Sequence, residues 1–160
     1  MTATATGTTL SLGIAEVKTV HAPDCVRTVL GSCIGIALCD TAARVGGMAH
    51  VMLPAAGRSD GAPGKFADTG TDLLIEMVLA AGAVRGRLVA KIAGGAMMFG
   101  TASDTGIGSR NAQAVVERLS HHGIGLAGSD VGGTHGRRMR LDPRSGSVEV
   151  QAIGQQPRIL

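Results

Sequence analysis

The alternation of apolar and small residues in residues 30–54 predicts one β-hairpin. Apolar side chains recur at every second position from Ile34 to Leu38, and the same alternation returns in residues 45–53. Residues 40–43 are the predicted turn. This stretch also carries a cysteine in a Gly-Ser-Cys setting and a histidine seventeen residues later. The rest of the chain is therefore interpreted around this hairpin.

The pairing register decides which of these side chains face each other. If Leu38 pairs with Val45, each further step keeps the sum of paired numbers constant, and Cys33 lies directly opposite His50. Directly opposed residues share a face, with Cβ atoms roughly 4.5–5.5 Å apart. A slip by one residue would separate the pair. An imidazole in this position can take the proton of a thiol, whose ordinary pKa is about 8.5, and produce a nucleophile.

Shorter patterns predict further strands and two helices. Strands are expected in residues 10–20, 88–93 and 124–129, and a second hairpin in 137–141 and 147–152. A turn is expected at 21–24. One helix is expected at 71–81, with Asp68 or Thr69 as its cap and Gly82 as its stop. A second helix is expected to follow a glycine-rich turn at 104–111, with Ser109 as its N-cap, and to end at Gly123. Five or more strands with two helices indicate an α/β or α+β layered domain.

Composition is typical of one aliphatic, turn-rich domain. The chain has 160 residues, of which 44% are hydrophobic and 25 are glycine, with two Phe and no Tyr or Trp. Residues 1–9 are expected to form a flexible tail, with one domain over 10–160. No apolar run is long enough for a membrane span, and the first residues do not look like a signal peptide, so a cytoplasmic location is expected. Its three cysteines are expected to stay reduced there.

Positive charge concentrates near the second hairpin, although the formal net charge is only +3. Four arginines contribute to it: Arg137, Arg138, Arg140 and Arg144. Nucleic-acid binding is not expected, because aromatic stacking residues and the spacings of nucleic-acid-binding motifs are missing from the sequence. A solvated strand face, or an edge that meets an acidic protein partner, explains the arginines better.

Several chemical residues also have simpler interpretations. A lone buried cysteine is usually a small hydrophobic residue, and a lone histidine is often a hydrogen-bonded core residue. A metal site from His21 and the three cysteines is not expected, because no CxxC or HxxxH spacing exists. Met97, Met98 and Phe99 are interpreted as core. The polar loop at 55–64 is expected to border a substrate cleft.

Several sequence blocks, in the same order over residues 10–150, resemble one known family. The blocks are LGSCIGIALCD followed by GGMAHVMLP, then GKFADTGTDLLIEMV, KIAGGAMMF, IGSRN and DVGGTHGRRMRLDPRSGSVEV. They resemble the CheD family, the chemoreceptor glutamine deamidases of bacterial and archaeal chemotaxis. The resemblance implies a sandwich-like β core with flanking helices.

The resemblance also implies roles for individual residues. Cys33 would be the nucleophile and His50 its base. The third family residue is a threonine, for which Thr28 is the candidate, although some relatives place it where this chain has Arg27. The amides around Ser32 and Cys33 could point at a developing oxyanion, and Gly31 permits a close or strained backbone before the nucleophile.

The implied function is hydrolysis of glutamine side-chain amides on chemoreceptors, through a Cys33 thioester, without a metal or other cofactor. A non-enzymatic adaptor that binds chemoreceptors and a CheC-type phosphatase is the alternative. A different thiol acyl-transferase, either a protease or a transglutaminase-like enzyme, is a third possibility, which its product would distinguish.

Overall fold

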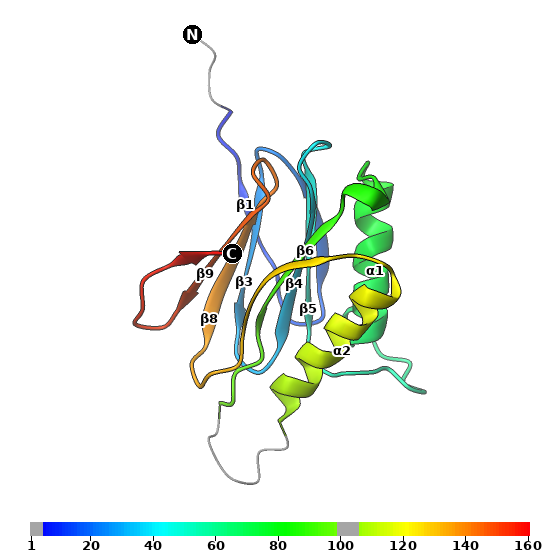
Figure 1. Ribbon diagram of the computed structural model, residues 1–160, viewed down its shortest axis with the longest axis vertical. Coiled ribbons are helices and arrows are strands. Elements are labelled where there is room, and N and C mark those ends of the chain that lie inside the picture. The colour runs from blue at the N-terminus through cyan, green and yellow to red at the C-terminus, as the bar shows by residue number, and fades with distance from the viewer. Residues whose placement is uncertain (1–4, 99–105) are drawn as a thin grey trace.

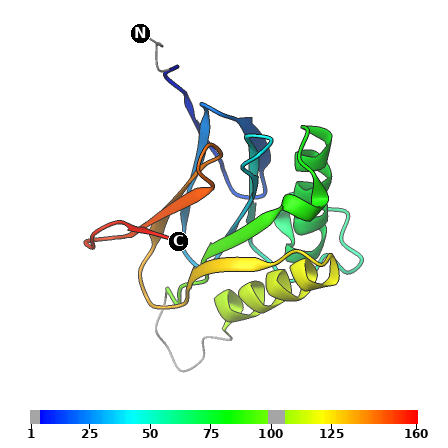
Figure 2. The same cartoon turned by 45° about the horizontal axis from the view of Figure 1, so that its top comes forward.

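The computed structural model describes residues 5–98 and 106–160. In these residues two five-stranded sheets pack face to face, and two helices cover the outer face of one sheet (Figures 1 and 2). The layers therefore follow the order sheet, sheet, helices. The predicted α+β layered class with a sandwich-like β core is confirmed.

Among the described residues, no helix covers the outer face of the first sheet, here sheet A (Figure 1). Its strand order is β1-β3-β8-β9-β10. The strands are β1 (Thr9–Ser11), β3 (Cys25–Leu30), β8 (Arg137–Asp142), β9 (Ser147–Ala152) and β10 (Arg158–Ile159). Strand β1 is parallel to β3, and the other neighbours are antiparallel. The predicted second hairpin is thus confirmed as β8 and β9.

The second sheet, sheet B, lies between sheet A and the helices. Its order is β2-β5-β4-β6-β7. The strands are β2 (Val17–His21), β5 (Val45–Val51), β4 (Ile34–Asp40), β6 (Val89–Gly94) and β7 (Leu126–Val131). Every residue of β4 and β5 is buried. Burial on both faces explains why apolar residues of these strands alternate with small residues rather than with polar ones.

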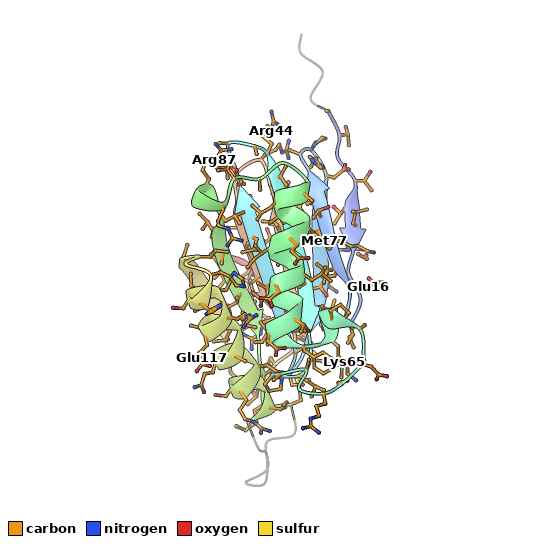
Figure 3. All side chains as sticks on the ribbon, turned by 90° about the vertical axis from the view of Figure 1, so that its right-hand side faces the viewer. Glu16, Arg44, Lys65, Met77, Arg87 and Glu117 are labelled. Atoms are coloured by element: carbon orange, nitrogen blue, oxygen red, sulfur yellow. The ribbon has the colours of Figure 1, made fainter. Side chains whose placement is uncertain are left out.

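Helices α1 (Ala67–Ala80) and α2 (Ile107–His121) lie side by side over sheet B (Figure 3), and the short 3-10 helices η1 (Pro63–Lys65) and η2 (Arg85–Arg87) flank α1 in the chain. Leu74 and Val78 of α1 are fully buried, whereas Met77 is partly exposed. A Cβ at Gly47 of β5 would lie 2.7 Å from Val78 Cγ1, so the glycine permits the close approach of α1. No helix of the described residues is long and apolar enough to cross a bilayer.

Two apolar cores follow from the three layers. One lies between sheet B and the helices, and it contains Ile34, Ile36 and Leu38 of β4. The other lies between the sheets, where Met48 of sheet B and Met139 of sheet A are both fully buried. Successive side chains of a strand point to opposite faces, so β4 and β5 supply both cores.

The central hairpin is present, but its predicted register is wrong by two residues. Asp40 pairs with Val45 and Leu38 with Gly47. The physical reason is the turn: the Asp40 carboxylate accepts the N–H of Ala43 at 3.1 Å, so Asp40 ends strand β4 and residues 41–44 form the turn. A shift of two residues keeps every side chain on its face. It nevertheless places Gly35, not Cys33, opposite His50.

Element boundaries and one core assignment also differ from the predictions. Helix α1 begins at Ala67, and Ser109 lies inside α2 rather than at its N-cap, which is Gly106. Met97 and Met98 are 44% and 46% exposed, so they are not core residues. Residues 99–105, which include Phe99 and part of the predicted glycine-rich turn, lie outside the described residues.

Two residues at the end of the predicted tail at 1–9 have defined contacts. Thr9 already pairs with Cys25, and the N–H of Thr8 donates to the Asp24 carboxylate at 2.9 Å. Residues 1–4 lie outside the described residues.

Candidate active site

His50 lies near the end of β5 and is hydrogen-bonded to the segment that precedes β2. Its N–H donates to the Glu16 carbonyl at 3.1 Å, and its carbonyl accepts the N–H of Ala15 at 2.9 Å. These bonds extend the β2–β5 ladder, in which Val17 pairs with Ala49. The imidazole is consequently held on a rigid strand and is only 3% exposed.

The His50 side chain reaches across to sheet A. Its Nδ1 lies 2.8 Å from Thr28 Oγ1, and the same hydroxyl donates to the Leu12 carbonyl at 2.8 Å. A hydroxyl has one hydrogen, and a carbonyl can only accept. The Thr28 oxygen therefore accepts a hydrogen from Nδ1, and in the neutral ring, which has one N–H, Nε2 then carries no proton.

Burial also favours the neutral imidazole. Desolvation lowers the pKa of His50 below its ordinary value of 6.5. The histidine thus combines two properties of a general base at neutral pH, a neutral ring and an unprotonated Nε2.

Cys33 lies in the bend at residues 31–33 that joins β3 to β4. It is partly buried and packs against the core between the sheets, which is also the space that the Thr28–His50 bond crosses. Burial raises the pKa of the Cys33 thiol. Among the described residues, the thiol makes no hydrogen bond or ion pair. At rest the thiol is therefore protonated and is not paired with His50.

Backbone contacts hold this bend on one side of sheet B. The Cys33 carbonyl accepts the N–H of Gly95 at 2.9 Å, and the Gly31 carbonyl accepts the N–H of Ala96 at 3.0 Å. Gly94 has a φ of +110°, and a Cβ there would lie 2.1 Å from the Cys33 oxygen. Only glycine allows both this backbone conformation and this close approach.

Asn111 of α2 joins the two halves of the site. Its Nδ2 donates to the Met52 carbonyl at 3.1 Å and to the Ser32 carbonyl at 3.4 Å. Met52 follows His50 by two residues, and Ser32 precedes Cys33. The side chain is fully buried, and its Oδ1 has no hydrogen-bond partner among the described residues. Asn111 is therefore a polar link between the nucleophile bend and the histidine strand.

The predicted oxyanion donors lie in the same bend. Gly31 and Ser32 are both partly buried. In residues 5–98 and 106–160, the N–H groups of Ser32 and Cys33 donate to no backbone carbonyl. Both amides thus remain available to an oxyanion formed next to the Cys33 sulfur.

A groove of about 590 Å³ opens beside the histidine. Thr28 and His50 line one part of it, and exposed side chains of β3, β8 and β9 line another. Cys33 is not among its lining residues, and neither is the loop at 55–64, so the expectation that this loop borders the cleft does not hold for this groove.

The other candidate ligands are spread over the fold. His21 Nε2 lies 3.0 Å from the Ala81 carbonyl, Cys39 Sγ donates to the Pro143 carbonyl, and Arg140 donates to Cys25 Sγ. The described part of the chain contains no group of three or more His, Cys, Asp or Glu side chains that could hold a metal ion.

Sequence reasoning missed three parts of this site: Asn111, the Leu12 carbonyl and the close approach at Gly94. The IGSRN block was the one signal for Asn111, because it belongs to the motifs that resemble a family. Leu12 acts through a backbone carbonyl, for which the sequence carries no side-chain signal. Gly94 is visible in the KIAGGAMMF block, but the sequence does not show that the Cys33 carbonyl lies against it.

The geometry defines a layered α+β protein in which a cysteine, a histidine and a threonine surround one end of the space between two sheets. The family model described as "CheD chemotactic sensory transduction" matches residues 52–152. The chain therefore belongs to the CheD family, as its motifs predicted.

Curated relatives cover nearly the whole chain. A Desulfitobacterium hafniense protein is 46% identical over 156 residues, which cover 94% of this chain and 98% of the relative. A Syntrophomonas wolfei protein is 44% identical over 157 residues, which cover 94% of this chain and 98% of that relative. One from Haloarcula marismortui is 46% identical over 146 residues, with 89% and 84% covered. All three are named "Probable chemoreceptor glutamine deamidase CheD".

Proposed function

We propose that this protein deamidates glutamine side chains of chemoreceptors in the cytoplasm. The hydrogen bond of 2.8 Å between Thr28 and His50 carries this proposal, because it prepares Nε2 of a buried, neutral imidazole to accept a proton. The names of the curated relatives supply the substrate, a chemoreceptor glutamine.

The first half of the reaction forms a thioester. The Cys33 thiol gives its proton to His50 Nε2 as the sulfur attacks the Cδ carbonyl of the glutamine. The N–H groups of Ser32 and Cys33 stabilise the resulting oxyanion. His50 then returns the proton to the amide nitrogen, the C–N bond breaks, and ammonia leaves.

The second half hydrolyses the thioester. A water gives a proton to His50 Nε2 and attacks the acyl carbon, and the C–S bond breaks. The proton passes to the departing Cys33 sulfur, which restores the thiol and releases glutamate. Thr28 holds the Nδ1–H throughout, so that the same nitrogen, Nε2, serves each proton transfer. No cofactor is needed for this sequence of steps.

The test is incubation with a chemoreceptor cytoplasmic fragment, followed by mass spectrometry of each glutamine-containing peptide. We expect a gain of about one dalton at specific glutamines with the wild-type protein, and none with Cys33→Ala. The exposed Ser59→Ala, in the loop at 55–64, is the matched control and should retain the wild-type rate. Equal deamidation by Cys33→Ala would overturn the proposal. A cleaved backbone would indicate a protease, and incorporation of an added amine a transglutaminase-like enzyme.

A non-enzymatic adaptor for chemoreceptors and a CheC-type phosphatase is the second candidate. The feature that favours it is that, among the described residues, the Cys33 thiol forms no hydrogen bond or ion pair, while burial raises its pKa. This candidate requires that Cys33→Ala bind the receptor fragment as tightly as the wild type while neither protein changes any glutamine.

A further inference from the structure

The outer face of sheet A is an uncovered surface with a concentrated positive charge. Arg27 of β3 pairs directly with Arg140 of β8, and Arg138 lies in the next row, opposite Val29. Directly opposed residues of antiparallel strands point to the same face. Arg137, the first residue of β8, points to the other side, where it is 5% exposed and pairs with Asp130 at 2.5 Å.

Glu149 of β9 lies directly opposite Arg140, but none of the three outward arginines forms an ion pair with a described residue. Arg27 Nε donates to Ser11 Oγ at 3.4 Å, and Arg140 donates to Cys25 Sγ at 3.2 Å, but neither contact brings a carboxylate. Arg138 makes no hydrogen bond or ion pair with any other described residue. Like charges directly opposite each other destabilise a sheet. The single carboxylate of Glu149 faces three arginines, so a further anionic group bound to this face would reduce the repulsion.

The arginines line the groove that also contains Thr28 and His50 of the candidate active site. Arg27, Arg138 and Arg140 contribute to it, together with one acidic side chain, Glu149, and the chain at residues 11–14. Strand β1 ends at Ser11, so the edge of β3 beyond Arg27 is uncovered. At this edge the groove passes from the outer face of sheet A to Thr28 and His50.

The groove also offers apolar surface between its charges. Val29 is 66% exposed and Ile14 is 58% exposed, and both line it. A partner that fits would therefore present carboxylates beside an apolar side chain. Arginine suits such a partner because its planar guanidinium binds carboxylates in a bidentate manner.

We propose that this groove binds an acidic segment of the protein substrate next to the glutamine that is deamidated. Carboxylates of that segment pair with Arg27, Arg138 and Arg140, and an apolar side chain packs on Val29 and Ile14. This inference rests on the proposed function, since it assigns the recognition of the same substrate. It explains how an enzyme can select particular glutamines on a protein.

The experiment measures receptor-fragment binding and deamidation separately, for wild type, Arg138→Glu and Arg85→Glu. Arg85 is an exposed arginine of η2, on the helical side of the molecule, and serves as the matched control. Binding is measured in the Cys33→Ala background at 50 and 300 mM NaCl, so that it does not depend on turnover. The rate of Cys33 alkylation in the Cys33-containing proteins checks that each site is intact.

We expect Arg138→Glu to weaken receptor binding at least tenfold and to raise KM by a similar factor, with kcat and alkylation unchanged. Added salt should weaken wild-type binding more than binding by Arg138→Glu, because screening acts on the lost ion pairs. Arg85→Glu should match wild type. Equal effects of the two substitutions, or none from either, would overturn the groove assignment.

The remaining outcomes separate this inference from the proposed function. Arg138-dependent binding without deamidation by the wild type would leave the groove assignment standing and reject the deamidase. Deamidation by Arg138→Glu with a wild-type KM would support the deamidase and reject the groove assignment. An effect of Arg138→Glu on binding of duplex DNA, but not of the receptor fragment, would assign the surface to nucleic acid and also overturn the inference.

Discussion

At the scale of single residues, the Thr28 hydroxyl decides which nitrogen of His50 carries the proton. Thr28→Val keeps the shape of the side chain but removes the oxygen that accepts Nδ1–H. The ring can then adopt the other tautomer, in which Nε2 is protonated and cannot act as a base. We expect kcat for deamidation to fall by about a hundredfold, at the lower end of the range typical of general-base effects.

The conservative variant distinguishes this role from packing. Thr28→Ser retains the hydroxyl and should recover most of the wild-type kcat, whereas loss of packing alone would affect both variants through the missing or altered methyl group. A Thr28→Val protein with wild-type kcat would show that the imidazole is oriented without Thr28.

The pKa shifts of His50 and Cys33 predict an unusual pH dependence. The base must be neutral, and burial lowers the pKa of His50. The activity kcat/KM should therefore persist below pH 6.5 and decline only as the pH falls through this lowered pKa. Burial raises the pKa of the Cys33 thiol, so alkylation of the resting enzyme by iodoacetamide should reach half of its plateau rate only above about pH 8.5.

The pH dependence of kcat/KM is measured with stopped deamidation assays between pH 4.5 and pH 8. The pH dependence of Cys33 alkylation is measured between pH 6 and pH 10.5. Urea-unfolded protein supplies the reference, with its thiol exposed to water. Rapid alkylation of folded Cys33 at pH 6 would indicate a thiolate–imidazolium pair and would contradict the resting state described above.

At the scale of elements, helix α2 connects the nucleophile bend to strand β5 through Asn111. Asn111→Asp replaces the Nδ2 donor with a carboxylate oxygen, which can only accept. The carbonyls of Ser32 and Met52 then lose their hydrogen bonds and face another acceptor. Leaving such buried groups unpaired costs about 1–3 kcal/mol each. We expect at least a tenfold loss of kcat, faster alkylation of Cys33 in the released bend, and a lower free energy of unfolding.

The control is Gln113→Glu, the same amide-to-carboxylate exchange at an exposed position of the same helix. It introduces a like charge four residues before Glu117, which costs only a few tenths of a kcal/mol in an exposed helix. Kinetics are measured at a temperature at which Asn111→Asp is fully folded. Under that condition a lower kcat reports the position of Cys33 and His50 and not a loss of folded protein. A folded Asn111→Asp with wild-type kcat and alkylation rate would leave Asn111 a purely structural residue.

The elements themselves could be predicted from periodicity, but their ends depended on single contacts. Alternation gave both hairpins, because each has a strand face that must be buried. The register failed because the Asp40 carboxylate closes the turn one residue later than the pattern suggests. The start of α1 failed for a similar reason: Phe66 precedes the helix without any side-chain capping bond, so no cap residue marks it.

In the candidate site, too, the residues could be predicted from the sequence but their contacts could not. Cys33 and His50 could be selected from sequence because they belong to one hairpin and to motifs that resemble a family. Their true relation, with Gly35 opposite His50, required the register. The contact between Thr28 and His50 joins two different sheets, and no pattern within a strand specifies how the sheets pack.

At the scale of the whole molecule, polar anchors fix how the layers meet. The site lies where sheet A, sheet B and α2 converge. The opposite end of β4 is held by Asp40, which is fully buried and accepts N–H groups from Val84 at 2.8 Å and from Arg87 Nε at 3.0 Å. Figure 3 shows Arg87 at the end of the molecule where Arg44 also lies. Asp40 thereby ties the central hairpin to the chain between α1 and β6.

This anchor predicts a loss of stability in acid. The hydrogen bond from Arg87, with further N–H groups, lowers the pKa of Asp40 from 3.8 to about 2. Because the folded-state pKa is below the unfolded value, the stabilisation is present above about pH 4 and is lost as the pH falls toward 2. A shift of this size corresponds to roughly 2 kcal/mol of unfolding free energy.

Urea unfolding at pH 7, 5, 3 and 2 of wild type and Asp40→Asn isolates this contribution, since the other titrating groups, including His50, are common to both proteins. Asp40→Asn should be the less stable protein at pH 7, because its amide hydrogens face the Val84 and Arg87 donors. The difference between the two should then narrow by roughly 2 kcal/mol between pH 5 and pH 2, as Asp40 becomes protonated in the wild type. A difference that stays constant over this interval would mean that the Asp40 carboxylate does not hold the two segments together through its charge.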